Sequence, residues 1–146
     1  MSRPADIVIE VSARLVAFTE DRLLLANHRG QNWYFLPGGN VEPGESIETA
    51  LRRETDEETG LRVRNIEFLG CVEHLYDEGG TIFHEINLLF AAQVPWGADI
   101  GSREDGIDIV SVAFDRLPAL DIRPAATTAA ITDWVNSRRP SWRPAP

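Results

Sequence analysis

The sequence has few of the features that mark secreted or membrane proteins. It contains no stretch of eighteen apolar residues and no basic segment followed by an apolar one at its N-terminus, so we expect neither a signal peptide nor a membrane span. Its single cysteine, Cys71, cannot form an internal disulfide, and its position in a strand-like run predicts a buried, inert thiol. These absences predict a cytoplasmic protein with no membrane partner.

Basic residues are also scarce. The chain has 14 basic and 23 acidic residues and a net charge of −9, which argues against general binding to nucleic acid or anionic membranes. Its 146 residues are enough for one domain with a sizeable core. We expect a single domain over residues 1–136, and the Pro- and Arg-containing residues 137–146 are predicted to form a disordered C-terminal tail.

The acidic residues are concentrated in one segment. Between Glu42 and Glu58, seven acids and two arginines give a charge of −5 in 17 residues. A phosphate-bearing substrate could not approach such a surface unless bound divalent cations reversed its local sign. The charge distribution therefore predicts a metal-dependent site.

Three glutamates in that segment have a spacing that matters on a helix. Residues three and four apart share a helical face, so Glu54 lies across one turn from Glu57 and Glu58. Taken alone, such a cluster is more often a solvated helix surface. Here a Pro37-Gly38-Gly39 turn precedes it and Gly60 suits a left-handed helix C-cap. The helix is predicted over residues 46–59, with its buried side formed by Ile47, Ala50, Leu51 and Thr55.

The remaining elements predict an α+β fold with a mixed β-sheet. A first hairpin is expected from strands at residues 7–19 and 23–26, followed by a short aromatic strand at 33–36. A second, longer hairpin spans residues 62–76 and 81–93. A long loop at 94–106, a strand at 109–114, a connector at 116–124 and a closing helix at 125–136 complete the order.

The glycines and charged residues around the helix resemble the Nudix box. The pattern G-x5-E-x7-R-E-U-x-E-E-x-G-U, where U is a bulky aliphatic residue, is matched at eight of nine positions: Gly39, Glu45, Arg53, Glu54, Glu57, Glu58, Gly60 and Leu61. Thr55 departs from it at an aliphatic position, and we expect that side chain to face the core. The resemblance implies a Nudix-type α/β/α sandwich over residues 7–135.

The resemblance also implies roles for the matching residues. Glu54, Glu57 and Glu58 would bind Mg²⁺, with Mn²⁺ as an alternative and the carbonyl of Gly38 or Gly39 as a further ligand. Arg53 would position the glutamates, although it could instead be only a surface partner of Glu57 four residues on. Glu45 would be its structural counter-ion near the helix start, where a negative charge is favoured, and Gly60 would end the helix.

The general base is left open between three glutamates. Glu57 could serve, but Glu85 lies inside an otherwise apolar strand, where an unpaired charge is costly to bury. By strand alternation it shares a face with Asn87, which favours a position facing a pocket; solvation at a sheet edge is the alternative. Glu104, with Asp105 beside it, lies in the long loop and could equally be a solvated acid.

Four residues are candidates for binding the substrate. Arg29, Trp33 and Tyr34 precede the box closely enough to line a pocket, and Trp96 in the long loop could stack on a base. Core packing is an equal alternative for the aromatic residues. The three histidines have no metal-ligand spacing among themselves, and we interpret them as strand residues.

The resemblance implies hydrolysis of a phosphoanhydride bond in a nucleoside diphosphate linked to another moiety. The HEINLLF strand and the loop after it look like those of bacterial members acting on ADP-ribose, so an ADP-ribose-like or nucleotide-sugar substrate is favoured. The alternatives are a housecleaning (d)NTP pyrophosphohydrolase and a Nudix-like module that senses a nucleotide without cleaving it. No nucleic acid partner is expected, and a homodimer is left open.

Overall fold

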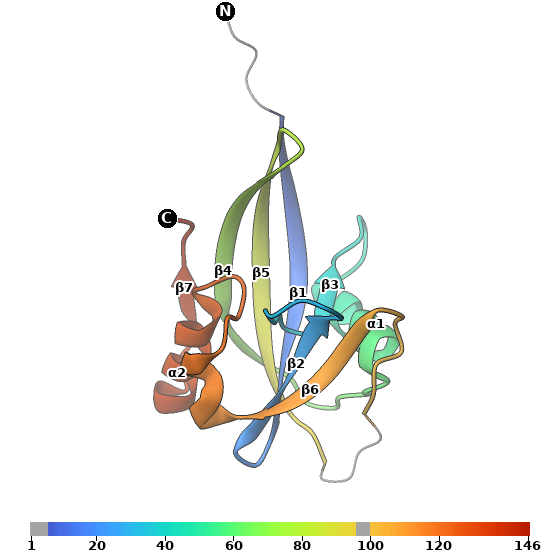
Figure 1. The fold of residues 1–146 in the computed structure, drawn as a ribbon, viewed down its shortest axis with the longest axis vertical. Helices are drawn as coiled ribbons and strands as arrows, with labels where there is room; N and C mark the ends of the chain where they lie inside the picture. Colours follow the sequence, from blue (N-terminus) through green and yellow to red (C-terminus); the bar gives the residue numbers. More distant parts are fainter. Residues whose placement is uncertain (1–5, 96–99) are drawn as a thin grey trace, which may run out of the picture.

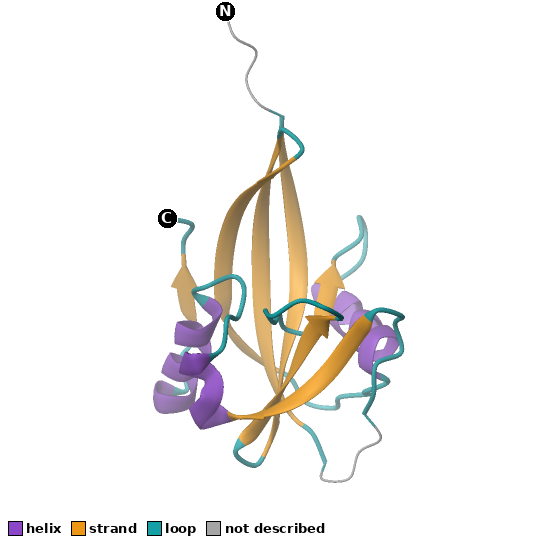
Figure 2. Ribbon diagram, viewed as in Figure 1, coloured by secondary structure: helices purple, strands orange, loops and turns teal. Residues whose placement is uncertain are grey.

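A large β-sheet forms the centre of the molecule, and a helix packs on each side of it (Figure 1; Figure 2). The computed structural model describes residues 6–95 and 100–146. The helices are α1 (Ile47–Thr59) and α2 (Thr127–Ser137), and a short 3₁₀ helix covers Phe114–Ala119. The strands are β1 (Ile7–Thr19), β2 (Arg22–His28), β3 (Gly38–Asn40), β4 (Glu67–Glu78), β5 (Thr81–Gln93), β6 (Ile107–Ala113) and β7 (Ser141–Arg143).

The strands form one mixed sheet in the order β6-β2-β1-β5-β4-β7, with β3 paired to β1. The long strands β1 and β5 run parallel from the Ile7–Ile82 pair to the Phe18–Gln93 pair, whereas β4 and β5 form the predicted antiparallel hairpin. The α+β class and the mixed sheet expected from the sequence are therefore confirmed.

Alternate residues of β1 build two separate cores. Ala13, Leu15 and Ala17 pack on the side that receives Leu51 of α1, whereas Val16 and Phe18 pack with Trp134 and its neighbours on α2. Side chains alternate between the two faces of a strand, so the two helices lie on opposite faces of the sheet. This is the layered sandwich that the sequence predicts.

Three local predictions differ from the structure. The tail at 137–146, expected to be disordered, contributes β7, which pairs in parallel with β4 at Gly70–Val72, and the indole of Trp142 donates to Glu73 over 2.6 Å. Residues 33–36 form only isolated bridges, at Tyr34 and Phe35, instead of a regular strand. Cys71 is half-buried, not fully buried. Among the described helices, none is long and apolar enough to cross a membrane.

Candidate functional site

Helix α1 is fixed at both ends by local signals that the sequence contains. The Ser46 hydroxyl accepts a hydrogen bond from the backbone N–H of Thr49, the usual arrangement of an N-cap. At the other end Gly60 takes the left-handed conformation, with φ 75°, and its N–H donates to the carbonyl of Asp56. Ala50 and Leu51 are buried, as is Thr55, so the glutamates of the box are turned toward the strand β3 and solvent.

Strand β3 brings two glycines against the helix. The backbone N–H of Gly38 donates to Oε2 of Glu58 over 3.2 Å. Only 5% of Glu58 is exposed, and its Oε1 has no hydrogen-bond partner among the described residues. Burial raises the pKa of Glu58 to about 7, while the hydrogen bond from Gly38 and the charge of Arg14 act in the opposite direction.

Gly39 leaves the space that the carboxyl group of Glu54 occupies. A Cβ built on Gly39 would lie 2.5 Å from the carboxyl carbon and from Oε2 of Glu54, far inside van der Waals contact. A Cβ on Gly38, whose φ is 138°, would lie 2.1 Å from the carbonyl oxygen of Ala13. The missing side chain of Gly39 therefore gives Glu54 room beside the turn, whereas that of Gly38 lets β3 lie close to β1.

Arg53 connects the acidic side chains. Its Nε and Nη2 donate to the carboxylate of Glu45 over 2.7 and 2.9 Å, and its Nη1 donates to Glu54 over 2.9 Å and to Glu57 over 3.5 Å. The hydrogen bonds from Arg53, and then that from the Glu42 N–H, lower the pKa of Glu45 to about 2. The hydrogen bonds to Glu45 and then to Glu54 raise the pKa of Arg53. The guanidinium thus holds three carboxylates in one arrangement.

The carboxylates fit a divalent cation only in part. Within residues 6–95 and 100–146, no three His, Cys, Asp or Glu side chains converge on one point. The Oε1 of Glu58 is nevertheless buried without a partner, the carboxyl group of Glu54 lies against Gly39, and Glu57 is a turn away and mostly exposed. Carboxylate and carbonyl oxygens are the ligands that Mg²⁺ prefers, so the donor set suits the ion.

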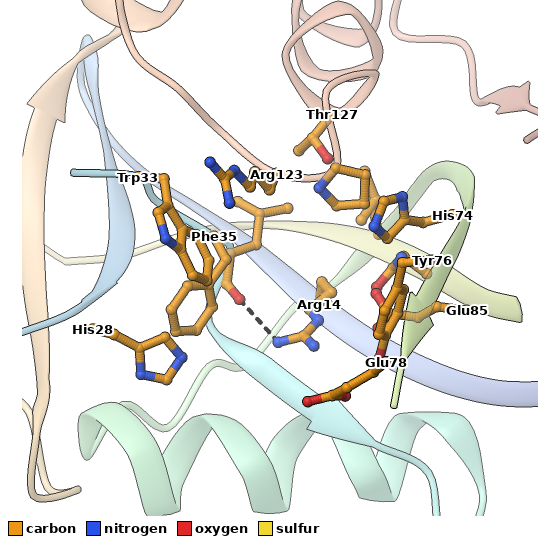
Figure 3. A pocket seen from close by; sticks show the side chains of 14 residues that line it. Arg14, His28, Trp33, Phe35, His74, Tyr76, Glu78, Glu85, Arg123 and Thr127 are labelled. Carbon is orange, nitrogen blue, oxygen red and sulfur yellow. Dashed lines mark hydrogen bonds between the residues drawn. The ribbon is translucent and has the colours of Figure 1, made fainter. Parts of the chain in front are cut away.

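A cavity of about 580 Å³ lies on the α2 side of the sheet. His28, Trp33 and Phe35 form one wall, with His28 and Phe35 4.8 Å apart between ring centroids, and Arg123 lies over the Trp33 ring at 4.8 Å. His74, Tyr76, Glu78 and Glu85 form the opposite wall. Arg14 lies between the two walls (Figure 3). The aromatic walls and the volume suit a planar ring such as a nucleobase.

Of the three predicted substrate residues that the structure describes, one lies in this cavity. Trp33 lines it, as expected. Arg29 is exposed and pairs with Asp108 over 3.2 Å, and Tyr34 packs against the core cluster of α2, so neither lines this cavity. Trp96 lies outside the described residues.

The candidate general bases lie on two sides of the site. Glu85 lines the cavity together with Asn87, so the shared face expected from strand alternation is present. The charge of Glu104 is close enough to raise the pKa of Glu58. The loop that carries Glu104 is tied to the end of α1 by the Arg103 N–H, which donates to the carbonyl of Glu58 over 2.9 Å.

Several cavity residues escaped the sequence analysis: Arg14, Phe35, Tyr76 and Arg123. Arg14 carried the same signal as Glu85, a charge inside an otherwise apolar strand, and could have been found by it. Arg123 lies in a connector with no motif, and only the folded chain brings it over Trp33.

A mixed sheet between two helices, with a glutamate-rich helix held against a double-glycine turn, defines a domain of the Nudix class. A family model described as the NUDIX domain matches residues 9–134, and the chain belongs to this family. The Nudix fold and the membership expected from the box are thus confirmed.

Comparison with individual proteins agrees with this assignment. The chain is 32% identical over 89 residues to the uncharacterized Nudix hydrolase YvcI of Bacillus subtilis, covering 60% of this chain and 56% of the relative. It is 31% identical to the NAD-capped RNA hydrolase NudC of Photobacterium profundum (77% and 40% covered). It is 33% identical to an 8-oxo-dGTP diphosphatase of Buchnera aphidicola (49% and 49% covered). The chain spans about half, or less, of the length of these relatives.

Solved structures share the fold. The MutT protein of Bacillus halodurans superimposes with a TM-score of 0.76 at 23% identity, covering 92% of this chain and 91% of that one. A MutT Nudix hydrolase of Burkholderia pseudomallei gives a TM-score of 0.71 at 25% identity, with 86% and 97% covered.

Proposed function

We propose that this protein is a Mg²⁺-dependent pyrophosphohydrolase that cleaves a phosphoanhydride bond in a nucleotide-type substrate. The observation that carries the proposal is the arrangement of three glutamates on α1: Arg53 donates to Glu54 and Glu57, and the Gly38-Gly39 turn contacts Glu54 and Glu58. A buried carboxylate oxygen without a partner is expensive for a fold to maintain. Its presence beside further carboxylates supports a cation-binding role.

The box residues would hold the cation. Glu54, Glu57 and Glu58 would supply carboxylate oxygens, and the carbonyl of Gly38 or Gly39 would supply another. When bound, Mg²⁺ offsets the charge of the pyrophosphate and lowers the pKa of water that it coordinates. Mn²⁺ has similar ligand preferences and is the expected substitute.

The chain's own side chains would orient the substrate. The base would stack on the wall formed by His28, Trp33 and Phe35. Arg53, which donates to three carboxylates, would keep them from turning toward solvent. Positioning of this kind is the main contribution a protein makes to phosphoanhydride hydrolysis.

The test is a substrate panel with product identification. The purified protein is incubated with Mg²⁺ and ADP-ribose, nucleotide sugars, dNTPs and 8-oxo-dGTP, and products are separated by chromatography. Glu57→Gln should reduce turnover by roughly a hundredfold, the range a general base or ligand supplies. Glu48→Gln is the matched control, because Glu48 and Glu57 lie on the same helix and each has 62% of its side chain exposed. Equal rates in the two variants would contradict the proposal.

We favour a nucleoside diphosphate linked to another moiety, such as ADP-ribose or a nucleotide sugar. The cavity supports this choice, because its second wall carries Glu78 and Glu85, and carboxylates accept hydrogen bonds from sugar hydroxyls but repel additional phosphates. Cleavage of ADP-ribose would release two monophosphates and no pyrophosphate, which chromatography distinguishes directly.

A (d)NTP pyrophosphohydrolase is the second candidate. The similarity to an 8-oxo-dGTP diphosphatase favours it. Release of pyrophosphate from a dNTP at a higher kcat/KM than from ADP-ribose would select this alternative. Nucleotide binding without turnover of any panel member would instead support the sensing module.

The base can be assigned by comparing three variants. Glu57→Gln, Glu85→Gln and Glu104→Gln would be assayed across pH 5 to 9. The variant that lacks the base should lose the acid limb of the kcat profile that the base produces, because the carboxylate whose deprotonation gives that limb has been removed. We expect the loss of the acid limb for Glu57, which is part of the box, or for Glu104, which lies beside it. For Glu85, which lines the cavity, we expect a change mainly in KM.

Light scattering on the same samples would test whether the protein forms a homodimer.

A further inference from the structure

Arg14 lies where the aromatic cavity meets the glutamate-bearing helix. It is paired across the sheet with Gly38, whose N–H donates to Glu58, and its Nη1 donates to the carbonyl of Leu36 over 3.2 Å. The same side chain lines the cavity, where Figure 3 shows its guanidinium between the aromatic wall and Tyr76. One residue therefore connects the two parts of the site.

The charge of Arg14 reaches both parts. On the helix side it is paired with Gly38, whose N–H donates to Glu58, and on the cavity side it opposes the burial that raises the pKa of Tyr76. Arg14 therefore lies between the cavity suited to a nucleobase and the carboxylates of α1.

Arg14 also lacks a carboxylate partner. In the described part of the chain it forms no ion pair, whereas Arg123, the other arginine of the cavity, pairs with Asp121 over 3.1 Å. A guanidinium has five N–H donors, and the Leu36 carbonyl accepts from one nitrogen. A half-buried cation with unused donors is best satisfied by an anion from outside the chain.

The acidic wall limits where that anion can lie. Glu78 and Glu85 line the cavity opposite the aromatic wall, and their charges would repel a phosphate. Arg123 is already compensated by Asp121. The favourable position for a phosphate is therefore beside Arg14, at the boundary with α1.

We propose that Arg14 binds a phosphate of a nucleotide whose base occupies the aromatic cavity, and so sets the pyrophosphate group against the glutamates of α1. The inference rests on the proposed function for the identity of the ligand as a nucleotide. It makes Arg14 a specificity residue that selects nucleoside phosphates over nucleosides.

The test compares two pairs of ligands, and the members of each pair differ only by a phosphate. AMP and adenosine, and GMP and guanosine, are titrated into ¹⁵N-labelled protein in the presence of Mg²⁺, and dissociation constants are read from amide shifts; none of these ligands has a phosphoanhydride bond to cleave. Arg14→Gln should weaken binding of the monophosphate by roughly 10- to 100-fold, the effect of losing a charged hydrogen bond. Nucleoside binding should stay within about twofold, because only the ring contacts are used.

Two variants complete the experiment. Arg14→Lys keeps a point charge without the guanidinium fork and should lose affinity for the monophosphate by an intermediate factor. Arg139→Gln removes the same charge at the opposite end of α2 from the cavity residue Thr127 and should change neither ligand. The amide spectra report in the same samples whether each variant is folded.

The outcomes separate the two proposals. Equal weakening of nucleoside and monophosphate in both Arg14 variants, or no weakening of either, would overturn the role of Arg14 even if the protein hydrolyses nucleotides. The expected loss of phosphate affinity, together with no turnover on the substrate panel, would retain Arg14 as a phosphate-binding residue and reject the hydrolase.

Discussion

Replacement of Gly39 by alanine should separate the chemistry of the site from the stability of the fold. The new Cβ would lie 2.5 Å from the carboxyl carbon of Glu54, and ordinary contact begins near 3.4 Å. The carboxylate must therefore retreat by about 0.9 Å, which also disturbs its 2.9 Å hydrogen bond from Arg53. A displacement of about 1 Å in a reacting group can cost roughly a hundredfold in rate.

The fold should tolerate the change. The obstructing group is the end of a flexible, partly exposed side chain, so the expected loss of stability is about 1 kcal/mol or less. Gly101→Ala is the control, because a Cβ there meets nothing within 4 Å and needs no left-handed backbone. The assay is steady-state kinetics over a Mg²⁺ titration, with thermal unfolding of each variant.

A second substitution tests the cause. If Gly39→Ala acts by displacing the carboxylate of Glu54, it should cost little more in a Glu54→Gln background, because contacting residues are not additive. Activity of Gly39→Ala within about threefold of the unmodified protein, or full additivity with Glu54→Gln, would refute the reasoning.

Three further predictions concern stability. Thr55 is fully buried and its hydroxyl has no hydrogen-bond partner in the described residues. Thr55→Val should therefore stabilise the fold by about 1 kcal/mol and raise Tm by about 3 °C. A lower Tm in calorimetry would contradict this. Glu45 has its pKa lowered from 4.5 to about 2, so its pairing with Arg53 stabilises the fold fully above about pH 4.5 and progressively less as pH falls toward 2. The difference in urea unfolding free energy between Glu45→Gln and the unmodified protein should therefore shrink over that range, and a constant difference would count against the pairing. Trp142→Ala removes the hydrogen bond to Glu73, so amide hydrogen exchange at residues 141–143 should become faster. If these amides already exchange at the random-coil rate in the unmodified protein, β7 is not formed in solution.

The parts of the fold that follow from local signals were predictable. The limits of α1 were set by Ser46 and Gly60, and its buried side by the spacing of Ala50 and Leu51. These features act within one or two turns of the chain, so the sequence displays them directly.

The C-terminal strand was not predictable because its partner is distant. Residues rich in proline and arginine usually favour disorder, but β7 pairs through backbone groups, which every residue type carries. The carbonyl oxygen of Ser141 approaches so closely that a Cβ on Gly70 would lie 2.4 Å from it. The tail can pair with β4 because Gly70, about seventy residues earlier, has no side chain. No local pattern near the tail reveals this.

The charge of the box segment shows what the structure adds to the argument from the sequence. The segment carries −5 when all charges are counted equally, but most of its acids have partners. Glu48 pairs with Arg52, Asp56 lies 3.8 Å from Arg62, and Glu45 takes the bidentate contact from Arg53.

The acids without full compensation are fewer than the net charge of the segment suggested. Glu54 and Glu57 share one guanidinium nitrogen of Arg53, and Glu58 is buried with one oxygen unpaired and with its pKa raised to about 7. A cation near these three groups would be stabilised by carboxylates that the fold has left incompletely neutralised, while the other acids of the segment would contribute little. The proposed cation site thus rests on the one helical turn on which the family resemblance depends, and not on the acidity of the whole segment.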